Sequence, residues 1–134
     1  MDVWFQFFQK YSGNSKIQFI LIGDDEIDQR IQALPNVCRT RDFGSYIITD
    51  LGFIQCADYF MSMASGPCNM ALFSKTPYLI LKDPDHHTLE MKKEIGDKDQ
   101  YIFAQKNQYI IREYQSAELL QTYFQKWFDS SYRT

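Results

Sequence analysis

The feature that most constrains the fold is a regular alternation between short apolar runs and segments with helical periodicity. The segment KIQFILIGD (16–24) is an almost continuous apolar run, as expected for a parallel strand covered on both faces. Similar strands are predicted at 37–40, 58–64 and 77–83, with helical patterns between them. Such βα units have right-handed crossovers that place helices on both faces of the sheet. The sequence therefore predicts one α/β, Rossmann-like domain over 1–134, a three-layer α/β/α sandwich whose mostly parallel sheet has about four to six strands.

The helices between these strands are predicted from apolar spacing and from capping residues. The segment 25–34 has helical spacing, with Asp24 or Asp25 as its N-cap. The segment 45–57 is also predicted to be a helix, because its apolar residues lie on one helical face and Ser45 can serve as its N-cap. The remaining patterns predict a short helix at 67–75, a strand at 100–104 and a polar surface excursion at 83–98. The segment 108–111 is predicted as a further strand or as an extended approach to the last helix.

Aromatic rings are expected to fill much of the core, because the chain has 11 Phe, 9 Tyr and 2 Trp. The first helix and the last helix, which is predicted to begin after a Ser116 cap, each carry apolar residues at the spacing of one helical face. We expect both stripes to face the core. If they were exposed, they would offer surfaces for self-association or for a missing N-terminal domain. The stripes consist of Trp4, Phe7, Phe8 and Tyr11 in the first helix, and of Leu120, Tyr123, Phe124, Trp127 and Phe128 in the last.

Charge and cysteine content exclude several classes of function. The net charge is −3 and no run of Lys or Arg exceeds two residues, so the chain lacks the basic footprint of a general nucleic-acid binder. Its three cysteines, at positions 38, 56 and 68, match neither a disulfide framework nor a zinc site and indicate a reduced, cytoplasmic protein. We identify no membrane span and no signal peptide, while peripheral contact with a membrane stays open.

The stretch SMASGPCNMALFSKTP (62–77) contains the strongest candidate site. Ser65 can cap the short helix that follows, Gly66 lets a ligand approach the backbone, and Pro67 suits a first helical position. Unpaired N–H groups at such a helix start favour an anion. Open parallel sheets bind ligands beyond the carboxyl ends of their strands. These residues therefore predict a phosphate site, with Asn69 in reach of the ligand, although they would also start a helix in a protein that binds nothing.

The stretch ADYFMSMASGPCNMALFSKTPYLIL (57–81) also resembles a known family. With FILIGDDE (19–26) and LPNV (34–37), it is similar to the donor-binding half of glycosyltransferases that have two Rossmann-like domains, and most of all to the heptosyltransferase type. The similarity covers roughly residues 15–83 and rests on the order of several short motifs. It implies binding of a nucleoside-diphosphate sugar as substrate, without a metal or a further cofactor, in the synthesis of lipopolysaccharide or another surface glycan.

The resemblance also implies roles for particular residues of this chain. The donor diphosphate would lie beside the small-residue loop, an earlier strand end would line the same crevice, and the loop 39–43 would recognise the base or ribose. The residues so implied are Ser65, Gly66, Pro67 and Asn69 for the diphosphate, and Gly23 and Asp24 for the crevice.

The chain departs from the family in ways that limit the expected activity. The usual first strand and the whole acceptor-binding domain are not in the sequence, and inverting members keep their catalytic base in that domain. Retaining members commonly have paired Glu in the donor domain, but no Glu lies between Glu26 and Glu90 here. We therefore expect an inverting type and no efficient sugar transfer by this chain alone, whether it is a fragment, a degenerate relative or a stand-alone domain.

Three other interpretations stay open. A non-catalytic flavodoxin-like or receiver-like module for protein interaction would use the acidic pair 24–25, but the acidic residue expected after its middle strand is replaced by the segment 63–65. His86 and His87 could bind a metal, although adjacent His side chains diverge and a solvated loop is expected. Cys68 could act as a nucleophile only beside a His partner. His86 or His87 could be that partner, but their spacing from Cys68 in the sequence does not require them to lie near it.

Overall fold

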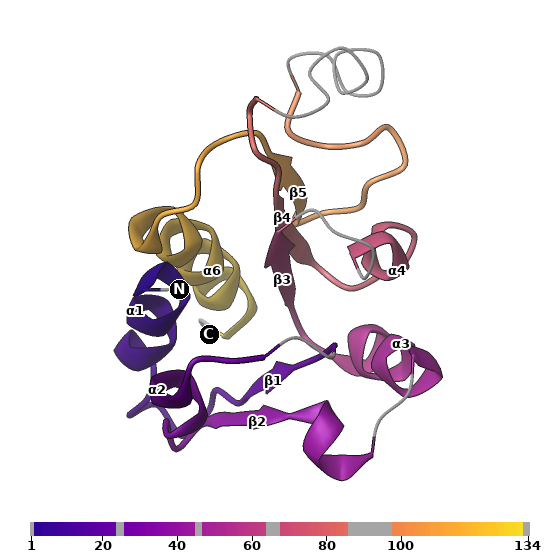
Figure 1. Cartoon of the computed structure of the whole chain (residues 1–134). Helices are drawn as coiled ribbons and strands as arrows, with labels where there is room; N and C mark the ends of the chain where they lie inside the picture. Colours follow the sequence, from indigo (N-terminus) through magenta and orange to yellow (C-terminus); the bar gives the residue numbers. More distant parts are fainter. Residues whose placement is uncertain (1, 24–25, 45–46, 64–67, 86–97, 133–134) are drawn as a thin grey trace.

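The structure, a computed structural model, describes residues 2–23, 26–44, 47–63, 68–85 and 98–132 (Figure 1). Short parallel strands alternate with helices along most of this length. The elements are α1 (Asp2–Lys10), β1 (Phe19–Leu21), α2 (Gln29–Gln32), β2 (Val37–Arg39), the 3-10 helix η1 (Thr40–Phe43), α3 (Ile47–Cys56), β3 (Phe60–Met63), α4 (Asn69–Leu72), β4 (Tyr78–Leu81), β5 (Gln108–Ile111) and α6 (Ala117–Tyr132).

The strands of the described residues form two parallel sheets. β1 pairs with β2, with Phe19 opposite Val37. β4 lies between β3 and β5, with Tyr78 opposite both Phe60 and Gln108. Figure 1 shows β1 and β2 running across the view and the other three strands running up it. The predicted α/β class and parallel pairing are confirmed, but these strands are divided between two sheets instead of joined in one sheet of four to six.

The three-stranded sheet is covered by helices on both faces, as Figure 1 shows. All four residues of its central strand β4 have an exposed fraction of 0%. Successive side chains of a strand point to opposite faces. Tyr78 and Ile80 therefore join the apolar residues of α3 and α4, while Leu79 and Leu81 join those of α1 and α6. This double burial explains why the strand reads as a continuous apolar run.

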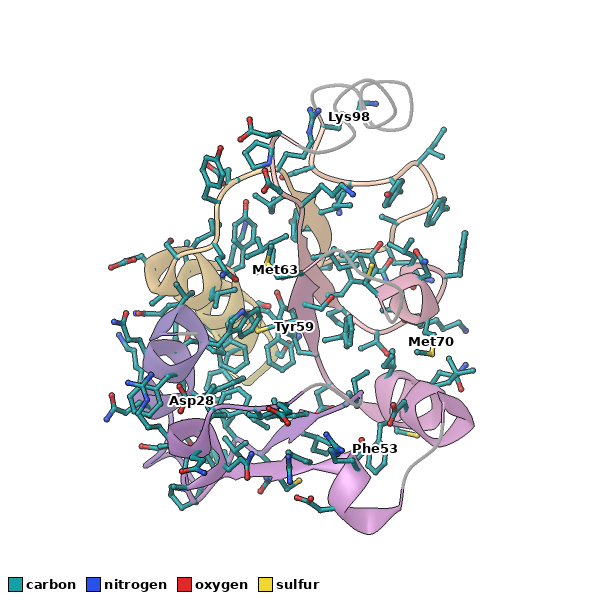
Figure 2. The ribbon with its side chains drawn as sticks, in the orientation of Figure 1. Asp28, Phe53, Tyr59, Met63, Met70 and Lys98 are labelled. Carbon is teal, nitrogen blue, oxygen red and sulfur yellow. The ribbon has the colours of Figure 1, made fainter. Side chains whose placement is uncertain are left out.

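The aromatic stripes of α1 and α6 pack on each other and on the sheet. The ring centroid of Phe124 lies 5.4 Å from that of Phe7 and 4.9 Å from that of Tyr11. Tyr59 stacks on Trp127 at 4.7 Å, and Figure 2 shows Tyr59 between the sheet and α6. The prediction of an aromatic core is confirmed. Most of these rings are buried, while Trp4, Tyr123 and Phe128 are partly buried, and self-association through the stripes stays a prediction.

Helix α2 is shorter than predicted and begins later. The segment 25–34 was expected to be helical from Asp24 or Asp25, but the N-cap is Asp28. Its carboxylate accepts a hydrogen bond from the Arg30 N–H at 2.8 Å and pairs with the Arg30 guanidinium. These hydrogen bonds lower the pKa of Asp28. The capping prediction is therefore wrong, because a later acidic side chain occupies that position.

The predictions near the C-terminus have mixed outcomes. Ser116 caps α6 as predicted, with its hydroxyl accepting a hydrogen bond from the Leu119 N–H at 3.1 Å. The strand predicted at 100–104 is wrong, because this segment turns and Ala104 N–H donates to the Tyr101 carbonyl at 3.0 Å. The aromatic and β-branched residues of this segment have a high β propensity. A segment forms a strand, however, only when it pairs with a neighbouring strand.

Candidate functional site

The predicted site residues lie only partly within the described chain. Gly23 follows β1 and Asn69 begins α4, so these two can be placed. Gly23 follows a strand of the two-stranded sheet, whereas Asn69 lies between two strands of the three-stranded sheet. The others lie outside the described residues, and their roles stay predictions: Asp24, Ser65, Gly66 and Pro67, together with His86 and His87.

Gly23 takes part in a buried polar network at the ends of β1 and β2. Its φ of 93° is a conformation that glycine adopts without strain. The Gly23 N–H donates to the Asp50 carboxylate at 3.3 Å, and the Thr40 hydroxyl donates to the same carboxylate at 3.0 Å. Asp50 is buried on α3 and Thr40 is buried directly after β2. This carboxylate therefore holds two strand ends to one helix, and it engages the backbone amide of Gly23, a residue that the resemblance places in the donor crevice.

The first residues of α4 have contrasting environments. Asn69 is exposed, so its amide is accessible to solvent, and its place beside a ligand stays a prediction. Cys68 has an exposed fraction of 6% and lies in an apolar cluster with Ala71 and Tyr78. Ala71 is fully buried, so its small side chain lets α4 sit close to the sheet. The burial of Cys68 gives its thiol little access to a substrate, which contradicts a role as nucleophile.

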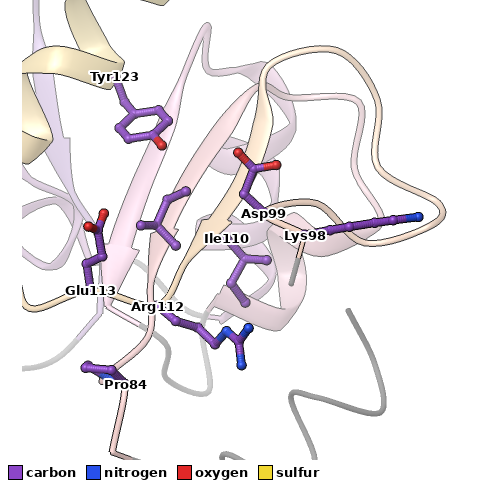
Figure 3. A pocket seen from close by; sticks show the side chains of 8 residues that line it. Pro84, Lys98, Asp99, Ile110, Arg112, Glu113 and Tyr123 are labelled. Atoms are coloured by element: carbon purple, nitrogen blue, oxygen red, sulfur yellow. The ribbon is translucent and has the colours of Figure 1, made fainter. Parts of the chain in front are cut away.

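A pocket lies where β4 and β5 end. Because β3, β4 and β5 are parallel, the loops that follow them meet at one edge of the sheet. The pocket has a volume of about 400 Å³ and opens beside β5 (Figure 3). One wall is a segment that runs along this strand, with Ile110 N–H donating to the Asp99 carbonyl at 2.8 Å. The lining residues are Pro84, Lys98, Asp99, Ile110, Ile111, Arg112, Glu113 and Tyr123.

Charged groups of both signs line this pocket. Arg112 and Lys98 supply cations, while Asp99 and Glu113 supply carboxylates. Burial and then the negative charges of Asp99 and Glu113 raise the pKa of Tyr123, so its phenol remains a neutral hydrogen-bonding group. Figure 2 places Lys98 beyond the carboxyl ends of the three strands. The pocket can therefore receive a polar ligand that has both an anionic part and hydroxyl groups.

The loops after β4 and β5 are linked beside this pocket. The Tyr114 hydroxyl donates a hydrogen bond to the Asp85 carboxylate. This bond, followed by the charge of Asp85, raises the pKa of Tyr114. The pocket is not evident from the sequence, because its lining residues come from four separate segments of the chain. One signal of the pocket is present in the sequence. Arg112 is a cation that directly follows the apolar segment 108–111.

Tyr78 combines complete burial with an unsatisfied polar atom. Its exposed fraction is 0%, and among the described residues its hydroxyl has no hydrogen-bond partner. Burial, followed by the nearby Tyr101 and Cys68, raises the pKa of Tyr78 to about 12. A buried hydroxyl without a partner costs free energy that an apolar ring of the same shape avoids.

We expect Tyr78→Phe to leave the free energy of unfolding at pH 7 unchanged or to raise it by about 1 kcal/mol. The pKa of Tyr78 is higher in the folded protein than in the unfolded chain. Titration of this phenol therefore leaves the stability of wild type unchanged below pH 10 and lowers it as the pH rises toward about 12. The variant should therefore unfold less readily than wild type over that interval. Urea denaturation at a series of alkaline pH values measures this. A loss of several kcal/mol at pH 7 would show that the hydroxyl has a partner.

Metal clusters and membrane spans are absent from the part of the chain that the structure describes. There, no three His, Cys, Asp or Glu side chains gather closely enough to hold a metal ion, and no helix has the length and apolar character to cross a bilayer. No protein-family model, no curated protein and no solved structure matches this chain.

Proposed function

We propose that this chain is a Rossmann-like nucleotide-sugar-binding domain of a glycosyltransferase, of the inverting, heptosyltransferase-like kind, acting in surface-glycan synthesis in the cytoplasm. The observation that carries the proposal is the parallel pairing of β3, β4 and β5. The segment 64–67 follows β3 in the sequence, and a pocket lined by two cations and two carboxylates lies where β4 and β5 end. Phosphate-bearing ligands bind at this edge of open parallel sheets.

In this proposal the diphosphate binds backbone amides of the loop 64–67, beside the exposed amide of Asn69. Arg112 is close enough to the strand ends to add a guanidinium, which suits phosphate oxygens. The carboxylates of Asp99 and Glu113 accept hydrogen bonds from sugar or ribose hydroxyls. A volume of about 400 Å³ lies in the range of small-molecule sites, large enough for part of such a donor.

The chemistry assigned to this chain is stabilisation of the leaving diphosphate. Backbone N–H groups and a guanidinium fixed at that position favour the charge that develops as the glycosidic bond breaks. The base that activates the acceptor belongs to the acceptor-binding half that the resemblance implies. We therefore expect donor binding by this chain, and sugar transfer only when that half is supplied.

Calorimetric titration with uridine, guanosine, adenosine and cytidine diphosphates, and with their sugar conjugates, tests the proposal. We expect at least one of these ligands to bind, and Gly66→Val to weaken it about tenfold or more, because the new side chain separates the ligand from the backbone. Gly13→Val is the matched control. It lies in the turn before β1, where an added Cβ meets nothing within 4 Å, and it should bind the ligand like wild type.

Arg112→Gln extends the same titration to the described pocket. Loss of a charge-assisted hydrogen bond should weaken the ligand by about tenfold. Arg30→Gln removes the same charge from the exposed pair on α2 and should leave the affinity unchanged. If the folded protein binds none of the nucleotides, the donor-site proposal is rejected in favour of the non-catalytic interaction module. Binding that Gly66→Val does not affect would exclude the loop 64–67.

A further inference from the structure

Large apolar side chains project into solvent from one side of the molecule. Ile102 has an exposed fraction of 100%, Phe73 of 78% and Phe103 of 43%. Phe73 directly follows α4, and the other two lie in the loop that Figure 1 draws in orange beside this helix. We call the surface formed by Phe73, Tyr101, Ile102 and Phe103 the apolar face. Single exposed apolar residues are ordinary, but a contiguous set of this kind marks an interaction surface.

Ring stacking joins the two segments that form the apolar face. Phe73 and Phe103 stack with centroids 4.6 Å apart and an interplanar angle of 25°. Tyr101 and Phe103 stack at 5.1 Å and 7°. The three rings therefore form a continuous stack that reaches from α4 to the following loop.

A buried glutamine fixes the same two segments beneath the rings. Gln108 has an exposed fraction of 1% and donates to the carbonyls of Ser74 and Thr76 at 2.8 and 2.9 Å. Its side-chain oxygen accepts a hydrogen bond from the Gln105 N–H at 2.8 Å. The apolar face is thus already ordered in the free protein, so docking would require little additional ordering of side chains.

The two sequence segments that form the apolar face carry a charge opposite in sign to that of the whole chain. The net charge is −3, yet the segments 68–77 and 100–107 contain no Asp or Glu. They do contain Lys75 and Lys106, and both of these residues are exposed. An apolar surface with lysines and no acidic residue complements a surface that is both apolar and anionic.

From these observations we propose that the apolar face docks onto an anionic lipid bilayer, with Ile102 and the rings in the boundary between headgroups and acyl chains. A protruding side chain that is fully exposed fits a fluid surface, which needs no preformed pocket to receive it. Tyr101 provides an amphipathic ring of the kind that is enriched at this depth. Lys75 and Lys106 then lie at the level of the anionic headgroups. This docking does not depend on the donor site.

Flotation with lipid vesicles tests the proposal. The wild-type chain should bind vesicles of phosphatidylcholine mixed with phosphatidylglycerol, and should bind vesicles of phosphatidylcholine alone several-fold less. Ile102→Asp should lower the partition coefficient by about tenfold or more, because a large apolar side chain is lost from the membrane. Ile102 is wholly exposed, so the melting temperature of this variant should equal that of wild type.

Lysine variants provide the matched charge comparison. Lys106→Gln should reduce binding to the anionic vesicles about fivefold, which corresponds to one lysine near a charged surface. Lys16→Gln removes the same charge from an exposed position before β1 and should bind like wild type. High salt should weaken the binding of wild type and reduce the difference between wild type and Lys106→Gln.

Three results would overturn the proposal. One is an absence of binding to anionic vesicles by the folded protein. Another is binding that Ile102→Asp leaves unchanged. The third is a concentration-dependent dimer, seen by light scattering, that Ile102→Asp dissociates, because a second copy would then be the occupant. Nucleotide titration of Ile102→Asp separates the two sites, since donor binding should remain at its wild-type strength.

Discussion

Phe124→Ala should lower the free energy of unfolding by about 3–5 kcal/mol, a large part of the total stability of a domain of this size. Phe124 has an exposed fraction of 4% and lies among the rings of α1, α6 and Tyr59. Removing its ring both forfeits apolar burial and leaves a cavity that neighbouring rings fill only in part. Urea denaturation followed by tryptophan fluorescence and far-UV circular dichroism measures the loss.

Phe73→Ala is the matched control, because the chemical change is the same and the exposed fraction of Phe73 is 78%. It should change the free energy of unfolding by about 0.5 kcal/mol or less. If the two variants lost similar stability, the assignment of the core to the rings between α1 and α6 would be wrong.

The rings that contact Phe124 also join α1 to α6, the first and last elements of the described chain. Two side-chain hydrogen bonds reinforce the aromatic contacts, one from Trp4 Nε1 to Gln115 Oε1 at 3.1 Å and one from the Tyr11 hydroxyl to Gln125 Oε1 at 2.9 Å. Contacts between residues so far apart in sequence form only when the intervening sheet is in place. The loss in Phe124→Ala should therefore appear as one cooperative transition and not as local fraying of α6.

Elements with a strong local pattern were predictable from the sequence. The stripe of α6 reflects burial that repeats with the helical period, and its Ser116 cap satisfies a backbone N–H of the first turn. The continuous apolar run of β4 reflects burial on both faces of the sheet. The parallel pairing of β3, β4 and β5 followed from the alternation of strands with helices. These predictions succeeded because local pattern and tertiary packing favour the same conformation.

Features set by distant contacts were not predictable in this way. The division into two sheets depends on how β1 and β2 lie against the rest, which no local pattern encodes. No local pattern marks Asp50, because its partners Gly23 and Thr40 follow two strands that are distant from it in sequence. The segment 100–104 has the composition of a strand, yet it forms a turn that carries Ile102 into solvent.

The candidate site shows the same contrast. The phosphate-loop prediction at Ser65, Gly66 and Pro67 came from residue types suited to a strand-to-helix turn, and these residues lie outside the described chain. The pocket beside β5 uses residues from loops and from α6, which the sequence does not bring together. Topology alone predicted the edge of the sheet, because the carboxyl ends of parallel strands must meet there.

Gln108→Glu should lower the free energy of unfolding at pH 7 by about 3 kcal/mol, because it places a carboxylate against two carbonyl oxygens in a buried site. Both hydrogen bonds from Gln108 to Ser74 and Thr76 would be replaced by repulsion between oxygens. Gln105→Glu makes the same change on an exposed side chain three residues earlier and should cost about 0.5 kcal/mol or less. Urea denaturation compares the two variants.

The pH dependence of Gln108→Glu identifies the cause of its loss. Burial against carbonyl oxygens raises the pKa of the introduced carboxyl, so the folded state binds a proton more tightly than the unfolded state does. The loss is therefore complete above this raised pKa and shrinks as the pH falls through it, when the protonated acid can donate one of the missing hydrogen bonds. A loss that does not change with pH would point to packing instead of charge. Because Gln108 also holds the segments of the apolar face together, this variant should bind anionic vesicles less tightly at pH 7, although Ile102, Lys75 and Lys106 are unchanged.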